Sequence, residues 1–196
     1  DGWAKARELA TELNLSFIPG MEITTEGRFT EKPFSIHLLA YLPDPEHPVL
    51  REILKTNRSA REVRMQAFVA NMQNDYPGLT YEYVLARVKP GATIGKPALA
   101  TALADLGYAS NASEVFKMGI LAKTSKYYVP NIAPDVLEVI PVVRNAGGVP
   151  VIAHPLMREK TAQQKEFVFP REDFVKMVEA GLLGLETNHS EVPPHV

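Results

Sequence analysis

The chain has 196 residues, of which 45% are hydrophobic and 22% are charged, so it is long enough to bury one substantial core. Lysine and arginine number 21 against 23 aspartates and glutamates, so no basic excess favours long duplex DNA or a membrane surface. The absence of cysteine excludes disulfides, thiolate nucleophiles and sulfur-ligated zinc. No apolar run reaches the roughly 20 residues of a membrane-spanning helix, and the first residues lack signal-peptide features, which favours the cytoplasm.

The first part of the chain predicts a helix followed by two strands. An apolar stripe from Trp3 to Leu13 has helical spacing, and Asn14 can end that helix. A short strand is predicted at Leu15–Ile18, stopped by Pro19 and Gly20, and a second at Phe34–Leu42. We expect the polar tract between them to fray into a loop.

A helical block is predicted next. Apolar residues keep a helical period from Val49 to Met72, which indicates one long helix or two short ones. Nothing between Val49 and Val129 resembles a strand, so we predict a helical insertion over residues 49–130. Three shorter helical patterns lie within it: Tyr81–Val88, Pro97–Leu106 and Ser113–Leu121.

Helices and buried strands alternate in the remainder of the chain. A helix at Asp135–Asn145, kinked by Pro141, precedes an apolar strand at Val149–Ala153. A helix at Arg171–Ala180 and a strand at Leu182–Thr187 follow. Such alternation predicts a parallel α/β sheet or barrel with the helices outside.

Polar residues fall close to these strands. Glu22 lies just past the first predicted strand, His37 within the second, His154 at the end of the third and His189 after the last. Side chains at the carboxyl ends of parallel strands converge on one face, where ligand sites form. Imidazole and carboxylate ligands suit zinc, manganese or iron, and such a site activates water for attack on a phosphoryl group. A single histidine at a strand end is more often a core or rim residue, so the prediction depends on this convergence.

Four segments together resemble the polymerase and histidinol phosphatase (PHP) superfamily. The likeness is greatest to the bacterial branch of nucleoside 3′,5′-bisphosphate phosphatases and 5′-to-3′ exoribonucleases, and it runs nearly end to end. In chain order the segments are Ile18-Pro-Gly-Met-Glu-Ile-Thr-Thr-Glu26, Ile36-His-Leu-Leu-Ala-Tyr41, Gly147-Gly-Val-Pro-Val-Ile-Ala-His-Pro155 and Gly184-Leu-Glu-Thr-Asn-His189.

The resemblance implies a distorted seven-stranded α/β barrel that holds up to three divalent cations (manganese, zinc or iron, with magnesium an option) beside a helical insertion. Residues 1–48 and 131–196 would form the earlier and later parts of that barrel. By position, Glu22 is similar to the bridging, catalytic carboxylate, and His37 and His154 are similar to metal ligands. His154 is also expected to be catalytic, and His189 is similar to a histidine near the substrate phosphate.

Departures from the family pattern limit what the chain supplies. The family's opening His-x-His and Thr-Asp-His-Asp segments and its distal Ser-Asp-x-His segment are not found, so we expect a fragment cut at both ends. Gly95-Lys96-Pro97-Ala98 stands where many relatives have Arg-Pro-His. Lysine holds a phosphate as a point charge. We therefore retain Lys96, and Lys126 or Tyr127, as substrate-binding candidates, with solvated surface groups as the alternative.

Three functional hypotheses follow. The first is a hydrolase acting on phosphate esters of small nucleotides or short oligonucleotides, a substrate class that fits the near-neutral charge better than a long duplex does. The second is another metal-dependent barrel hydrolase, such as an amidohydrolase. The third is a catalytically silent PHP-like binding module. The sequence leaves the oligomeric state open.

Overall fold

The computed structural model describes residues 2–29, 33–155 and 170–187. The chain divides into two compact units, and each has its own hydrophobic core. Unit 1 is a helical unit formed by Lys55–Ile132. Unit 2 contains a sheet and is formed by the segments on either side, Gly2–Leu54 and the chain from Ala133 onward.

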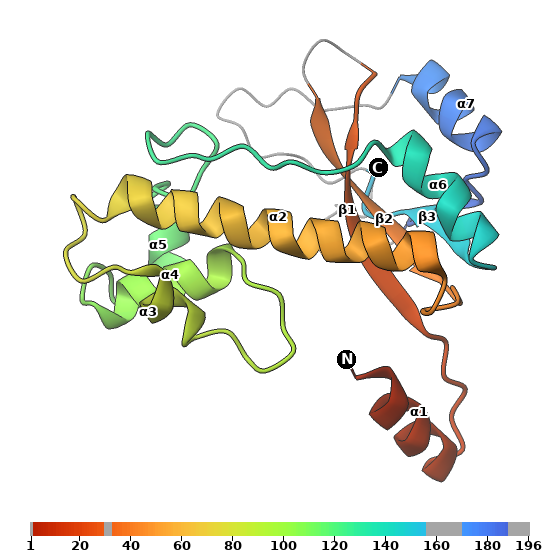
Figure 1. The fold of residues 1–196 in the computed structure, drawn as a ribbon, viewed down its shortest axis with the longest axis horizontal. Helices are drawn as coiled ribbons and strands as arrows, with labels where there is room; N and C mark the ends of the chain where they lie inside the picture. Colours follow the sequence, from red (N-terminus) through yellow and green to blue (C-terminus); the bar gives the residue numbers. More distant parts are fainter. Residues whose placement is uncertain (1, 30–32, 156–169, 188–196) are drawn as a thin grey trace. The chain divides into compact units, whose positions relative to one another are not determined.

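Unit 2 is built around a four-stranded sheet in the order β1-β2-β3-β4. Figure 1 labels the first three of these strands. Strands β1 and β2 are antiparallel, β2 and β3 are antiparallel, and β3 and β4 are parallel. The elements are α1 (Trp3–Glu12), β1 (Gly20–Gly27), β2 (Phe34–Tyr41), the start of α2 (Pro48–Met72), α6 (Val136–Asn145), β3 (Val149–Ile152), α7 (Arg171–Glu179) and β4 (Gly184–Leu185).

The first strand does not lie where the sequence predicts it. Leu15–Ile18 is irregular and exposed, and β1 begins at Gly20, the residue expected to stop it. Gly20 pairs with Tyr41, and a side chain at Gly20 would meet the Tyr41 ring at 3.1 Å, so glycine permits this close pairing. The polar tract expected to fray is thus a complete strand, and Glu22 lies within it.

The prediction of a parallel sheet is correct only for β3 and β4, which α7 connects. Only residues 28–33 join β1 to β2, and a link this short permits an antiparallel hairpin, whereas a parallel crossover needs a dozen residues or more. The four strands of the described ranges do not establish the seven-stranded barrel, which stays a prediction.

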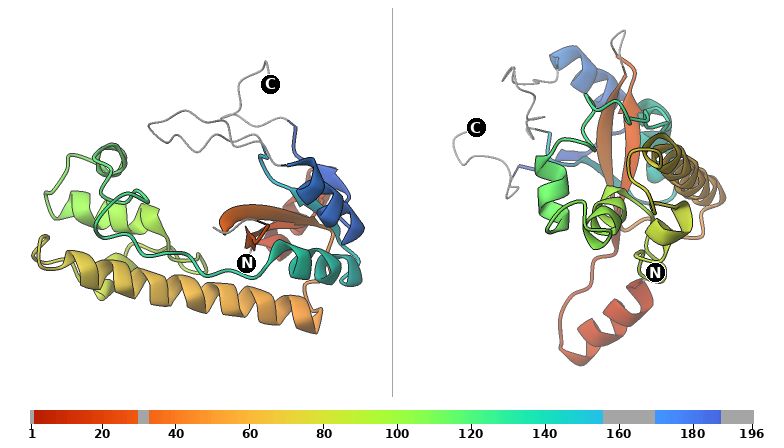
Figure 2. Two further views of the ribbon diagram at one scale, coloured as in Figure 1. Left: turned by 90° about the horizontal axis from the view of Figure 1, so that it is seen from above. Right: turned by 90° about the vertical axis from the view of Figure 1, so that its left-hand side faces the viewer.

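One face of the sheet is buried against α6 and α7 (Figure 2). Ile23, Leu38 and Ile152 point from successive strands into this core, where they meet Ile140 of α6 and Met177 of α7. Asp135 caps α6, because its carboxylate accepts the backbone N–H of Leu137 at 2.8 Å, and the helix continues through Pro141. Strand alternation therefore directs the intervening residues of β1 and β2 to the opposite face.

Helices are the regular elements of unit 1 in its described residues, and turns and irregular segments connect them. Unit 1 contains most of α2, which is one continuous helix of 25 residues, and α3 (Tyr81–Leu85), α4 (Lys96–Asp105) and α5 (Ala112–Lys117). Thr80 and Asn111 cap α3 and α5 with their side-chain oxygens. The helical character of this block agrees with the sequence, and its status as an insertion into a barrel stays a prediction.

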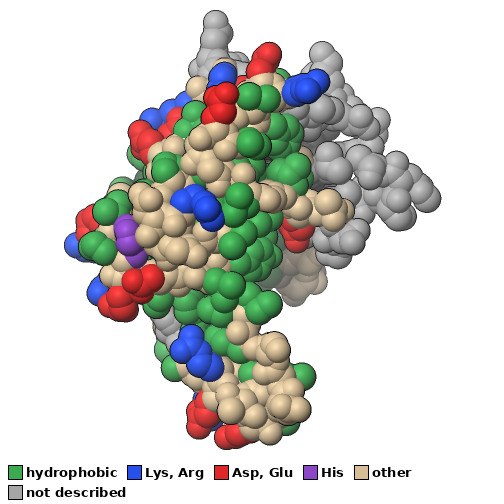
Figure 3. Space-filling view, turned by 90° about the vertical axis from the view of Figure 1, so that its right-hand side faces the viewer, with side chains coloured by type: hydrophobic (Ala, Val, Ile, Leu, Met, Phe, Trp, Pro, Cys, Tyr) green, Lys and Arg blue, Asp and Glu red, His purple; other side chains and the backbone are tan. Residues whose placement is uncertain are grey.

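Charge is mixed on the surface. Acidic and basic side chains are interspersed among hydrophobic ones on the face drawn in Figure 3, rather than gathered by sign. Among the described residues, no helix is both long enough and apolar enough to cross a bilayer.

Candidate metal centre

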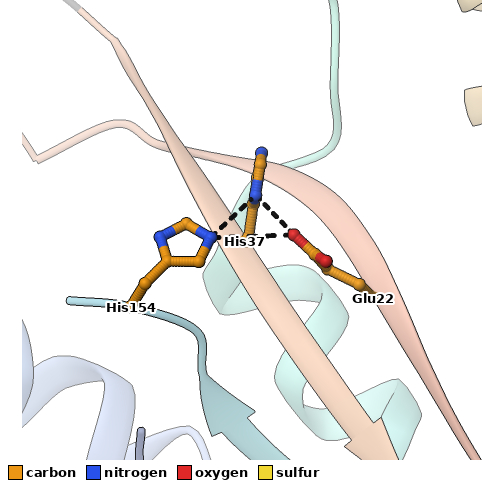
Figure 4. Close-up of side chains that lie close together, drawn as sticks. All are labelled: Glu22, His37 and His154. Carbon is orange, nitrogen blue, oxygen red and sulfur yellow. Dashed lines mark hydrogen bonds and ion pairs between the residues drawn. The ribbon is translucent and has the colours of Figure 1, made fainter. Parts of the chain in front are cut away.

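Glu22, His37 and His154 meet on the open face of the sheet in unit 2 (Figure 4). His37 Nδ1 lies 2.5 Å from Glu22 Oε1 and 3.1 Å from His154 Nε2, and His154 Nε2 lies 3.7 Å from Glu22 Oε1. All three side chains are partly exposed, with 49%, 35% and 20% of their areas accessible. The cluster is therefore open to a ligand.

Glu22 and His37 lie close together because β1 and β2 pair in an antiparallel ladder. The sequence predicts a different cause, in which the carboxyl ends of parallel strands meet. Glu22 pairs with Leu39, and His37 pairs with Thr24. Glu22 and His37 are thus diagonal neighbours, a spacing that long side chains can bridge. His154, two residues beyond the end of β3, is the member whose position at a strand end the sequence predicts correctly.

Glu22 is held in its ionised form. Its hydrogen bond with His37 lowers the pKa of the carboxyl group below 4.5, assisted by the charges of His37 and His154 and opposed by partial burial. An ionised carboxylate is the form that binds a cation. The site thus presents a negatively charged ligand over a wide pH range.

The backbone of His154 is unusual, because its φ is +33°. A residue other than glycine held in this region carries roughly 1–3 kcal/mol of strain. Its backbone N–H donates to Oε2 of Glu186, just after β4, at 2.7 Å. Hydrogen bonds to charged groups contribute about 1.5–3 kcal/mol, so this contact can offset the strain.

These donor atoms fit a divalent metal ion. One carboxylate oxygen and two imidazole nitrogens lie within 4.8 Å of one another. Ligand atoms around a tetrahedral zinc ion stand roughly 3.3 Å apart, given metal–ligand distances of 2.0–2.1 Å. The three measured separations bracket that value, and only small side-chain movements would equalise them.

No family model matches the chain, but individual proteins do. A protein from Bifidobacterium adolescentis, provisionally described as a metal-dependent phosphoesterase, matches 98% of this chain with a TM-score of 0.84 and 36% sequence identity. The 5'-3' exoribonuclease Rnm of Escherichia coli is 31% identical over 155 residues, or 78% of this chain. In sequence and in fold, the chain is thus similar to PHP-type phosphoesterases.

The PHP-type likeness covers only part of each relative. The chain spans about half the length of the exoribonucleases that it matches, from 47% to 57%, and 65% of the Bifidobacterium protein. An amidohydrolase from Chromobacterium violaceum is 22% identical with a TM-score of 0.74, and the match covers 94% of this chain and 61% of that one. At 22% identity this likeness shows a common fold alone. It does not distinguish the hydrolysis of phosphate esters from the hydrolysis of C–N bonds.

The predicted substrate-binding residues have different surroundings. Lys96 lies in unit 1, with Nζ 5.9 Å from the ring centroid of Phe68 and 5.8 Å from that of Tyr128. Lys126 is paired with Asp75 at 2.6 Å, so a phosphate would compete with this carboxylate. A third candidate, His189, lies outside the described residues.

Two residues that lie near the predicted site residues are not predicted by the sequence analysis. Glu186 follows β4, and the rule that directs attention to strand ends could have found it. Arg64 lies over the same two rings as Lys96, at 5.4 Å from Phe68 and 5.7 Å from Tyr128. No local pattern distinguishes this arginine from the other charged residues of α2, so its proximity to Lys96 becomes visible only in the fold.

Proposed function

We propose that the protein is a metal-dependent phosphoesterase in which Glu22, His37 and His154 bind divalent ions: manganese, zinc or iron, up to three in the intact site. The observation that supports this most directly is the cluster of one carboxylate and two imidazoles within 4.8 Å. Bound metal would supply activated water and offset the charge of the phosphoryl group. The phosphoesterase and exoribonuclease relatives support this chemistry over C–N hydrolysis.

The three proposed ligands would have different roles in binding the metal. Glu22 is the charged ligand, and its lowered pKa keeps it ionised. Its two oxygens point along different lone-pair directions, so it can bridge two ions. His37 and His154 would bind the ion through Nδ1 and Nε2, and each imidazole must be neutral to do so.

We propose a nucleotide or a short oligonucleotide as the substrate. The matched exoribonucleases support RNA as the polymer. Lys96 and Arg64 offer two cations within 6 Å of the same aromatic rings, which suits one phosphate rather than a long backbone. We retain His189 and Lys126 as additional substrate contacts.

Metal analysis combined with substitution tests this function. In the intact protein we expect Glu22→Ala or His154→Ala to lower phosphate release from a nucleotide panel at least about 100-fold and to reduce bound metal, with folding preserved. Lost activity with unchanged circular dichroism would support the assignment. Full activity and full metal content in either variant would contradict it.

Glu179→Ala is a suitable control, because this exposed glutamate lies on α7 in the same unit. It should retain activity and metal. Amide substrates in the same assay separate the amidohydrolase alternative. A protein that binds metal and RNA but hydrolyses neither class of substrate would be the silent binding module.

A further inference from the structure

His154 has a backbone conformation that its sequence does not favour. Its φ of +33° lies in the left-handed region, and Pro155 follows it. Residues other than glycine rarely adopt this region, and a residue before proline normally prefers an extended backbone. Contacts with the rest of the sheet must therefore hold this conformation.

Glu186 makes such a contact. Its Oε2 accepts the backbone N–H of His154 at 2.7 Å, and its own N–H donates to the carbonyl of Ile152 at 2.9 Å. The second bond extends the parallel pairing of β3 with β4 by one step. Glu186 is thus fixed by the neighbouring strand, and its side chain reaches the first turn beyond β3.

The residue before His154 is tied to the other neighbouring strand. The N–H of Ala153 donates to the carbonyl of His37 at 2.9 Å. The segment after β3 is therefore held by β2 on one side and by Glu186 on the other. Between these two restraints, Nε2 of His154 lies 3.1 Å from Nδ1 of His37.

We propose that Glu186 is a positioning residue of the metal centre: by accepting the backbone N–H of His154, it fixes the direction in which this imidazole presents Nε2. The inference rests on the proposed function, because it assigns to His154 the role of a ligand. Glu186 acts through the backbone of His154 and is not one of the three ligands. Residues that orient metal ligands typically change metal affinity by about 10–100-fold when they are replaced.

The test compares three substitutions at Glu186 in the intact protein, with zinc affinity measured by calorimetry. Glu186→Leu removes the hydrogen-bond acceptor. Glu186→Asp keeps the negative charge but shortens the side chain, so that its carboxylate no longer reaches the N–H of His154. Both should weaken zinc binding by about 10–100-fold. Glu186→Gln keeps a carbonyl oxygen at the same reach and should stay within about threefold of the wild type.

Two further measurements separate positioning from a general loss of structure. The amide proton of His154 should move upfield in Glu186→Asp without metal, because its hydrogen bond to a carboxylate is lost, while the other sheet amides stay in place. Glu179→Leu removes an exposed carboxylate of the same unit and should leave zinc affinity unchanged. Glu186→Asp also keeps the comparison possible if the leucine variant does not fold.

Unchanged zinc affinity in Glu186→Asp would overturn the inference. The inference would also be overturned if Glu186→Gln lost as much zinc affinity as Glu186→Leu. That result would mean that the charge of Glu186 matters, and not the hydrogen bond that it accepts. The proposed function fails separately, if His154→Ala binds zinc as tightly as the wild type. Loss of zinc in His154→Ala with full affinity in Glu186→Asp would remove only the positioning role.

Discussion

Glu22 supplies the negative charge of the candidate metal centre, and its neighbours decide the pH range over which that charge persists. The hydrogen bond with His37 lowers its pKa below 4.5, and the nearby charges of both histidines act in the same direction. Ionised Glu22 therefore stabilises the folded, metal-free protein fully above about pH 4.5, and this contribution is lost as the pH falls through the lower, folded-state pKa.

Replacing Glu22 by glutamine should remove this pH dependence. In a chelator, we expect the unfolding free energy of Glu22→Gln to fall less steeply than that of the wild type as the pH decreases below about 4.5. The difference should be at most about 1 kcal/mol, because half of the Glu22 side chain is exposed and solvent screens the pair. Urea unfolding at a series of pH values measures it. Parallel pH profiles for the two proteins would contradict the expectation, and Glu179→Gln serves as control.

Replacing Lys96 should weaken substrate binding without weakening the fold. Partial burial lowers its pKa, as do the like charges of Arg64 and Lys123, so its cation is disfavoured in the folded protein and an anion would relieve it. We expect Lys96→Met to raise KM for a nucleotide by about 10–100-fold, the range of a charged hydrogen bond, without lowering the melting temperature. Steady-state kinetics and calorimetry check both effects. An unchanged KM would reject the phosphate contact, and exposed Lys89→Met is the matched control.

At the scale of elements, the sequence locates the helices and most strands, but it misplaces β1. Helical periodicity places Pro97–Leu106 and Arg171–Ala180 within one residue of α4 and α7. Apolar residues at helical spacing, such as Leu99 with Leu103 in α4 and Phe174 with Met177 in α7, pack against the two cores. Strand β1 was misplaced because its buried positions include Thr25, whose hydroxyl donates to the carbonyl of Ile36 at 2.8 Å. A threonine satisfied by a partner eleven residues away looks like loop sequence when it is read locally.

The direction of strand pairing explains what could be anticipated at the site. Glu22, His37 and His154 were selected because of their side-chain types near predicted strands, and the structure brings them together. These residues meet because β1, β2 and β3 pair in two antiparallel ladders. The short link that favours the first ladder is recognised only when β1 is placed at Gly20–Gly27, and the predicted strand at Leu15–Ile18 hides it. Glu186 was missed for a related reason, because its partner is a backbone N–H 32 residues away.

At the scale of the whole molecule, the candidate centre depends on two segments that lie far apart in sequence. His37 and His154 are separated by 117 positions, and the helical unit 1 intervenes. Pairing of β2 with β3 brings these segments together, so the ligand set is complete only when unit 2 is folded. Unit 1 has its own core and contributes none of the three proposed ligands.

Metal should therefore protect the two units unequally. At a zinc concentration about 100-fold above Kd, binding should stabilise unit 2 by about 2.7 kcal/mol, because the ion binds the folded site in preference to the unfolded chain. Hydrogen exchange of the intact protein, followed by mass spectrometry with and without zinc, would show this. We expect slower exchange in β1, β2 and β3, and little change in α4. His154→Ala should abolish the difference, whereas equal slowing in α4 and β2 would place the metal's effect outside the proposed centre.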